Sequence, residues 1–292
     1  MMGFIKVLRV NMKLKRLHIR TRIKQKLFKQ YGLRLLKVRK QEFYGKKFKL
    51  VGMQIRLDYE TGWLMQLVQD AEVIFDVGCN TGQTAVLFHA FSQASKIYLF
   101  EPNPYALAIC AENAILNGFA EKIKLYNNCV SNISGKEMEF YTVLSGAAGS
   151  VDQDFARTAS NLGESYLTNS ITLDGIAKCE NVVPDLVKID VEGHEYQVLC
   201  GSIILTQNQK TKFLVEMHSS PSLSMEENGN NVINWAKEQN YKVIYLKEMV
   251  ILKESSQIKH RGRCHLLLAP SDYVLSLELQ SIKQSTPPQK IV

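Results

Sequence analysis

Short apolar runs alternate with amphipathic stretches from about residue 70 to residue 270. The runs that combine apolar and β-branched residues are 72–78, 96–102, 122–130, 136–143, 185–190, 212–218, 241–246 and 264–270. Stretches with helical spacing follow several of them, at 83–94, 105–117, 195–200 and 231–239. Strands that alternate with helices predict an α/β fold: a doubly wound, Rossmann-like sheet of seven mostly parallel strands, with helices on both faces.

The pattern changes at its end and in its middle. The runs 241–246 and 264–270 have no helical stretch between them, and strands joined without a crossover pair antiparallel, so an antiparallel edge strand is expected. Residues 144–170 are rich in Gly, Ser, Ala and Thr with little periodicity, which predicts a loop over the sheet. The expected divisions are a basic amphipathic segment 1–50, a main domain 51–270 and a flexible tail 271–292.

Positive charge is concentrated at the amino terminus. Residues 1–50 hold 17 Lys or Arg and one acid, Glu42, so they carry +16; since the whole chain carries +8, the remainder carries −8. Apolar residues at near-helical spacing among these cations predict a basic amphipathic helix. Four roles stay open for it: covering the main domain, lying on an anionic membrane surface, binding RNA, or organelle targeting. No aromatic residues are regularly interleaved, so nucleic acid is the weakest partner.

The overall composition is that of a soluble globular protein. Hydrophobic residues make up 46% of the chain and charged residues 22%, and no apolar run approaches the length of a membrane span. The six cysteines form no CxxC pair, which favours reduced thiols over disulfides or a zinc site. A cytoplasmic protein is expected, at most peripheral at a membrane surface, and no metal ligands are assigned.

A glycine turn follows the first strand of the main domain. The segment FDVGCNTGQT contains Asp76, Gly78 and Gly82, and glycines at such a turn allow left-handed backbone before a helix. The turn lacks two of the three glycines of a dinucleotide fingerprint, so NAD is disfavoured. Glu101 ends the next strand, where a carboxylate can accept both hydroxyls of a ribose. These residues predict a nucleoside-type ligand.

The segment PDLVKIDVEGHEYQVLCG, residues 184–201, ends a strand in a cluster of charge. Three carboxylates and an imidazole follow the apolar run, and buried groups of this kind are costly without partners or a task. Lys188, inside the run, is expected to reach a carboxylate or the chain surface. His194 stands in a helix-starting turn, where a structural role is favoured over a catalytic one.

These segments resemble the class I S-adenosylmethionine-dependent methyltransferases, and within them the FkbM family. DVGCNTGQT, ITLDGIA, PDLVKIDVEGHEYQVLCG and FLVEMH occur in that family's order and spacing, over about residues 72–220. The family has Asn at the middle of the glycine turn, as Asn80 is here. The resemblance implies O-methylation of sugars, glycans or polyketide-type natural products, with S-adenosylmethionine as the cofactor. The implied cofactor-binding residues are Asp76, Gly78, Asn80 and Gly82 for the methionine part, Glu101 for the ribose, and Asn128 and Cys129 for the adenine.

Methyl transfer to a hydroxyl needs aligned reactants and a group that takes the hydroxyl proton. Asp190 and Glu192 follow the fourth strand of the expected sheet, and His218 ends the fifth, so all three are predicted catalytic residues. His218 is the first choice for the base. Glu192 is either a base, a substrate ligand or a helix cap, and Asp190 positions the hydroxyl or the cofactor, or binds a metal.

Two other functions compete with an O-methyltransferase for a hydroxylated acceptor. One is an RNA methyltransferase that uses the basic arm, which an acidic core and the lack of a known RNA-binding module disfavour. The other is a non-enzymatic adaptor at a membrane or on RNA, which would have no use for Asp76, Gly78, Gly82 and Glu101.

Overall fold

The computed structural model describes residues 37–282, with gaps at 53, 57, 143–148, 158–159, 161–164 and 260–261. The basic amphipathic helix expected before residue 37 lies outside the described residues, as does the tail after residue 282. No helix among the described residues is long and apolar enough to cross a bilayer.

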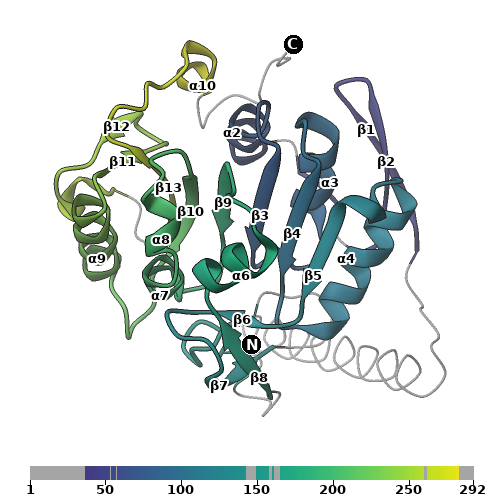
Figure 1. The fold of residues 1–292 in the computed structure, drawn as a ribbon, viewed down its shortest axis with the longest axis horizontal. Coiled ribbons are helices and arrows are strands. Elements are labelled where there is room, and N and C mark those ends of the chain that lie inside the picture. The colour runs from purple at the N-terminus through teal and green to yellow at the C-terminus, as the bar shows by residue number, and fades with distance from the viewer. Residues whose placement is uncertain are drawn as a thin grey trace, which may run out of the picture.

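A central sheet organises the chain (Figure 1). Its order is β12-β11-β13-β10-β9-β3-β4-β5, and β3, β4, β5, β9 and β10 pair in parallel. The strands are β3 (Val73–Val77), β4 (Lys96–Phe100), β5 (Ile123–Tyr126), β9 (Leu186–Ile189), β10 (Lys212–His218), β11 (Tyr241–Tyr245), β12 (Val250–Ile251) and β13 (Arg263–Pro270). Strand order reverses between β3 and β9, and the carboxyl ends of strands at such a switch point form a crevice where ligands bind.

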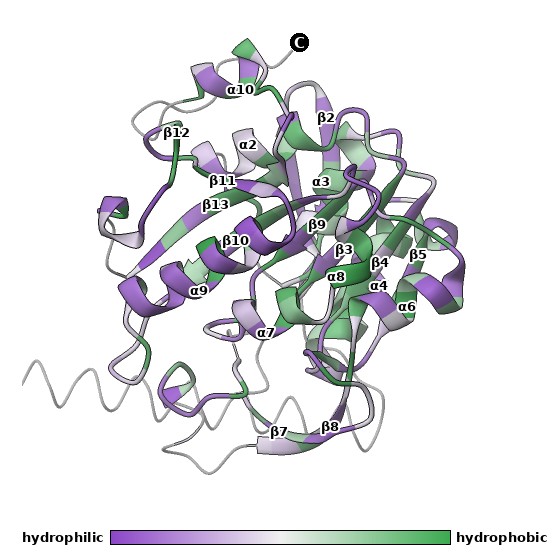
Figure 2. Cartoon of the chain, turned by 60° about the vertical axis from the view of Figure 1, so that its left-hand side comes forward, coloured by the Kyte–Doolittle hydropathy of each residue, from purple (hydrophilic) through white to green (hydrophobic). Residues whose placement is uncertain are grey.

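Helices cover both faces of this sheet (Figures 1 and 2). One buried cluster joins the sheet to α2 (Tyr59–Leu67), α3 (Gln83–Phe91), α4 (Pro104–Leu116) and α10 (Leu277–Ser281). The other joins it to α6 (Leu173–Glu180), α7 (Glu195–Cys200), α8 (Ile203–Thr206) and α9 (Met225–Glu238). Successive residues of a strand point to opposite faces, so Ile74 enters the first cluster and Phe75 the second. The predicted α/β fold with helices on both faces is confirmed.

The antiparallel part of the sheet differs from the prediction in one respect. The expected antiparallel pair at this edge is present, as β11 with β13. The antiparallel strand β13 is not the edge strand, because it also pairs with β10 and so lies between β10 and β11. The crossover through α9 makes β11 run parallel to β10 and leaves a gap, which the returning β13 fills. The two-residue strand β12 adds an eighth strand beyond β11.

A second, three-stranded sheet has the order β6-β8-β7, formed by β6 (Cys129–Val130), β7 (Glu137–Tyr141) and β8 (Ser165–Ile171). The loop expected over residues 144–170 is therefore wrong for its last six residues. The sequence SYLTNSI is too polar to resemble a buried strand, and in the structure three of its residues are half-buried and one is buried. Backbone hydrogen bonds to β7 hold this strand in place. Such bonds do not require an apolar composition, so the composition did not predict the strand.

The amino-terminal hairpin joins β1 (Arg39–Phe43) to β2 (Lys46–Leu50). The prediction from charge placed these residues in the basic amino-terminal segment. In the structure, Phe43, Phe48 and Leu50 are buried in the same cluster as α3 and α4. At the other end, Leu279 of α10 is buried against the first cluster as well. Apolar contacts therefore attach both regions to the main unit, as burial of large apolar side chains contributes most to packing.

The glycine turn after β3 lies in close contact with the end of β9. Gly78 has a φ of 80°, and a Cβ built on it would lie 1.8 Å from the carbonyl oxygen of Asp190. Gly82, at a φ of 79°, would bring a Cβ within 2.5 Å of the Cys110 sulfur. Asn80 between them has a φ of 47°, a left-handed conformation that Asn tolerates better than most residues. Both glycines are needed because protein atoms, not a ligand, fill the space beside them.

We expect Gly78→Ala to destabilise the fold by about 3 kcal/mol, because it combines a left-handed Cβ penalty with overpacking against backbone. Gly118→Ala is the matched control: Gly118 has a φ of 75° but no atom within 4 Å of the added carbon, so about 1 kcal/mol is expected. Urea unfolding of both variants measures the difference. Equal losses would show that the approach to Asp190 does not constrain the turn.

Candidate active site

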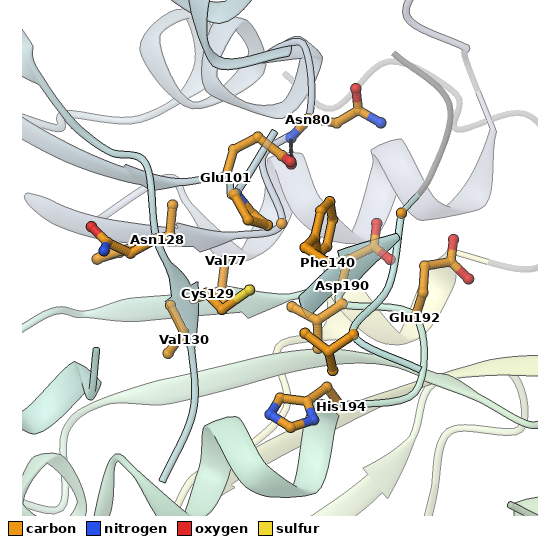
Figure 3. Close-up of a pocket in the computed structure, with 16 residues that line it drawn as sticks. Val77, Asn80, Glu101, Asn128, Cys129, Val130, Phe140, Asp190, Glu192 and His194 are labelled. Atoms are coloured by element: carbon orange, nitrogen blue, oxygen red, sulfur yellow. Dashed lines mark hydrogen bonds between the residues drawn. The ribbon is translucent and has the colours of Figure 1, made fainter. Parts of the chain in front are cut away.

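A cavity of about 270 Å³ opens at the carboxyl ends of β3, β4 and β9. Figure 3 shows its walls: Glu101 and Asn80 on one side, Asn128, Cys129 and Val130 on another, and Asp190, Glu192 and His194 on a third. Phe140 of β7 also lines it, so the small sheet contributes to the pocket. Polar groups at two ends of an otherwise apolar cavity are typical of a small-molecule site.

Glu101 is almost fully buried at the end of β4. Its Oε2 accepts a hydrogen bond from the Asn80 amide at 2.9 Å (Figure 3). Its Oε1 accepts one from the Asn103 amide at 2.8 Å. Burial raises the pKa of Glu101 to about 7, although the two amides oppose this change. The carboxyl group therefore titrates near neutral pH, and it ties the glycine turn to the end of β4.

Asp76 lies beneath the cavity and does not line it. Its side chain is inaccessible to solvent; it accepts a hydrogen bond from the Thr84 hydroxyl and lies 3.7 Å from the Lys188 ammonium. Burial raises the pKa of Asp76, while Lys188 and Thr84 oppose the change. Gly82 also lies outside the lining residues. The contacts of Asp76 and Gly82 are with the protein itself, whereas Gly78, Asn80 and Glu101 face the cavity.

Lys188 is the counter-ion of this region. Besides Asp76, its ammonium lies 3.3 Å from Asp190 Oδ2, which agrees with the expectation that it reaches a carboxylate. Burial alone would lower the pKa of Lys188, but Asp190 and Asp76 outweigh it and raise the pKa. The lysine is therefore a permanent cation between the ends of β3 and β9.

Asn128 and Cys129 line the cavity where the adenine was expected. Asn128 donates its side-chain amide to the carbonyl of Asn169, which links this wall to β8. Burial raises the pKa of Cys129 to about 12, so the thiol stays protonated and behaves as a small apolar group.

Asp190, Glu192 and His218 come together, but only the two carboxylates line the cavity. His218 Nε2 lies 3.4 Å from Glu192 Oε2 and 4.0 Å from Asp190 Oδ1. Glu192 has a φ of 51°, a left-handed conformation that is costly for a residue with a long side chain. The Ser150 hydroxyl donates to its carbonyl and helps to hold it there. Burial raises the pKa of Glu192.

His218 is buried among carboxylates. Burial by itself would lower the pKa of His218, but hydrogen bonding and attraction from Glu195, followed by Glu192 and Asp190, raise it to about 9. The ring is thus an imidazolium at neutral pH, not the free base that the sequence suggested. The sequence did not predict that two residues of this region contribute to the site: Glu195, which has no solvent exposure, and Phe140. In the sequence alone, a glutamate in the first turn of a helix resembles an acid that caps the helix.

His194 lines the cavity from the turn before α7. Its Nε2 lies 3.0 Å from the hydroxyl of Ser131, and burial lowers the pKa of His194 to about 4. The ring is therefore neutral, and it serves as a polar part of the wall between the carboxylates and β6.

A second cavity of about 400 Å³ shares Asp190 with the first. Its lining carries both signs of charge, from α2 and the segment before it and from β9, β10 and β13, and α3 adds uncharged residues. The acidic and basic lining residues are Arg56, Asp58, Glu60, Lys188, Asp190, Glu216, Arg263 and His265. Arg263 binds Glu216 at 2.8 Å and Glu60 at 3.2 Å, so part of this charge is neutralised internally.

Two clusters among the described residues have the spacing of metal ligands: Glu60 with Glu216 and His265, and Asp190 with Glu192 and His218. In the first, the Arg263 guanidinium already occupies both carboxylates. In the second, Lys188 binds Asp190 and the imidazolium faces Glu192. Cations of the protein thus compensate both sets of carboxylates, and we assign a metal to neither.

A parallel sheet with a cavity at its switch point, a buried acid after β4 and carboxylates after β9 define a class: an α/β protein with a site for a nucleoside-type ligand. The model of the methyltransferase FkbM domain matches residues 76–243, more than half of the chain. The chain belongs to this family. The predicted family is therefore confirmed.

Curated relatives align over about half of the chain. The hexuronic acid methyltransferase AglP of Haloferax volcanii is 27% identical over 164 residues, which cover 53% of this chain and 60% of the relative. The 2-O-methyltransferase NoeI of Sinorhizobium fredii is 28% identical, over 52% and 65%. The 31-O-demethyl-FK506 methyltransferase FkbM of Streptomyces tacrolimicus is 29% identical, over 46% and 60%. The chain thus spans less than two thirds of each relative.

Among solved structures, a methyltransferase FkbM from Methylobacillus flagellatus aligns with a TM-score of 0.43 and 13% identity, over 68% of this chain and 44% of that one. TYW2 from M. jannaschii, solved in complex with AdoMet, aligns with a TM-score of 0.42 and 15% identity, over 82% and 86%.

Lys188→Met should destabilise the fold by about 3 to 5 kcal/mol, because it leaves the buried Asp76 carboxylate without its cation. Adding Asp76→Asn should restore more than half of that loss, since the double variant leaves only the partly exposed Asp190 without its cation. Urea unfolding of the two single variants and the double variant completes a double-mutant cycle. Simple addition of the two losses would contradict the assigned pairing.

Proposed function

We propose that the protein is an S-adenosylmethionine-dependent O-methyltransferase that methylates a hydroxyl of a sugar, a glycan or a natural product. The observation that carries the proposal is the meeting of a buried ribose-type acid, Glu101, and the pair Asp190 and Glu192 in one cavity. The relatives support the acceptor class, because they are named as a hexuronic acid methyltransferase, a 2-O-methyltransferase and a methyltransferase for 31-O-demethyl-FK506.

The two cavities fit the two ends of the cofactor. The first combines the Glu101 carboxylate with the apolar surface of Phe140, Cys129 and Val130, which suits a ribose and an adenine. The second presents both signs of charge, which suits the ammonium and carboxylate of an amino acid. Asp190 belongs to both linings, so the centre of the cofactor would lie beside it.

When bound, the cofactor supplies an electrophilic methyl group on a sulfonium cation. The carboxylates of Asp190 and Glu192 provide negative potential for that cation and a place for the acceptor hydroxyl. Asp190, fixed by Lys188, orients the hydroxyl. Glu192 receives its proton, because its carboxylate lines the cavity and burial raises its pKa toward a useful range.

His218 assists from behind Glu192. Its protonated Nε2 faces the Glu192 carboxylate at 3.4 Å and holds it in place in the unloaded protein. A ring that has released its Nε2 proton to solvent would have Nε2 free to accept a proton, and a second cation bound in the cavity would favour that release, because two like charges repel in a site of low dielectric constant. The three predicted catalytic residues would then act as one group.

Calorimetric titration with S-adenosylmethionine tests the proposal directly. Wild-type protein should bind in the micromolar range, and Glu101→Ala should weaken binding about tenfold or more, since hydrogen bonds to a charged group are lost. Glu238→Ala, on the exposed face of α9, is the matched control and should bind as the wild type does. Transfer of labelled methyl to a panel of hexoses and hexuronic acids then tests the acceptor class. Folded protein without cofactor affinity would overturn the proposal.

Cofactor affinity should depend on pH through Glu101. The ribose hydroxyls donate hydrogen bonds, so they favour the ionised carboxylate, whereas the free protein holds a proton there below about pH 7. Binding below that pH must release the proton, and the dissociation constant should fall by up to about tenfold per unit as the pH rises toward 7. Above pH 7 it should level off. Glu101→Gln should remove most of this dependence; an unchanged slope would exclude Glu101 as its source.

A further inference from the structure

Glu195 is a buried carboxylate whose two oxygens both have partners. It has no solvent exposure in the first turn of α7. Its Oε1 accepts the Gly193 amide at 2.8 Å and lies 2.9 Å from His218 Nδ1. Its Oε2 accepts the side-chain amide of Asn228 at 3.2 Å. A buried acid with this many donors is held in one position.

Asn228 connects this carboxylate to the strand that carries the histidine. Asn228 lies in α9, is almost fully buried, and donates the same side-chain nitrogen to the carbonyl of His218 at 3.0 Å. Glu195 and the backbone of His218 are thus held by one amide. Three elements, α7, α9 and β10, fix the position of a single imidazole ring.

The contact decides which way the ring faces. A carboxylate oxygen accepts only, so the ring nitrogen beside Glu195 carries a hydrogen in both the neutral and the charged form. Nδ1 is occupied in this way, and Nε2 is left to face Glu192 at 3.4 Å, Glu216 at 3.6 Å and Asp190 at 4.0 Å. The nitrogen that gains or loses a proton during a reaction is then the one nearest the cavity wall.

We propose that Glu195, held by Asn228, is a positioning residue that fixes the His218 ring with Nδ1 protonated and Nε2 turned toward Glu192. This role rests on the proposed function, since it gives the methyltransferase a histidine that exchanges protons only on the cavity side. Glu195 itself lines neither cavity.

Nuclear magnetic resonance of protein labelled at histidine nitrogen tests the role without an acceptor. The six histidines of the chain give few ring signals, and His218→Gln identifies the one from His218 by its loss. In the wild type we expect a slowly exchanging Nδ1 proton at neutral pH and, above the ring's titration midpoint, a neutral form protonated at Nδ1. In Glu195→Gln the slow proton should exchange at least tenfold faster, and the midpoint should fall by about one to two pH units.

Other charged groups near the ring require a control that separates charge from position. The carboxylates that face Nε2 are Asp190, Glu192 and Glu216, and the basic side chains next to them are Lys188, Arg263 and His265. Glu216→Gln removes one of these carboxylates on the Nε2 side. It should lower the midpoint as well, but leave the neutral ring protonated at Nδ1 with its slow proton. Glu195→Asp, which keeps the charge, should restore part of the midpoint but not the slow exchange.

Three outcomes decide the proposal. A slow Nδ1 proton and an unchanged midpoint in Glu195→Gln would overturn it. If that variant does not fold, Asn228→Ser replaces it; faster exchange of the His218 Nδ1 proton supports the role, and unchanged exchange rejects it.

Calorimetry on the same samples separates this inference from the proposed function. Glu195→Gln should keep the wild-type affinity for S-adenosylmethionine, whereas a wild type that binds none defeats the function and leaves the ring signals as an independent result.

Discussion

The site depends on one buried ammonium group, that of Lys188. Parallel strands bring their carboxyl ends to a single edge, and here those ends carry Asp76, Asp190 and Glu216. Carboxylates gathered in a space of low dielectric constant repel each other strongly. Lys188 contacts two of them, on neighbouring strands, and so permits a negatively charged crevice in a stable fold. The remaining negative potential favours a cationic cofactor.

Close packing of backbone sets the shape of that crevice. Gly78 lets the turn after β3 approach the carbonyl of Asp190, and the Asp190 amide in turn donates to the carbonyl of Val77. Glu101, at the end of β4, accepts a hydrogen bond from the Asn80 amide. Three consecutive strand ends are therefore locked together around the first cavity. In the sequence, Gly78 suggests room for a ligand. In the structure, the backbone of Asp190 fills the space beside it.

The arrangement of acids around His218 changes the expected division of roles. A histidine at a strand end suggests a free base, but four nearby carboxylates keep this ring protonated at neutral pH. Glu192, strained into a left-handed conformation and facing the cavity, is better placed to meet a hydroxyl. The imidazolium neutralises its neighbours in the unloaded protein, and the charge of a bound cofactor would alter that balance.

The alternation of the main strands and helices, the family and seven of the sixteen residues that line the first cavity were determined by the sequence itself. Hydrophobic periodicity is a local property, and the motifs around Asn80, Glu101 and Asp190 are contiguous, so both can be read along the chain. Tertiary structure decided what depends on distant partners. It placed β13 between β10 and β11, paired a polar β8 with β7, and removed Asp76 from the cavity. It also joined Glu195, His218 and Asn228, since hydrogen bonds and pKa values arise from groups that only folding brings together.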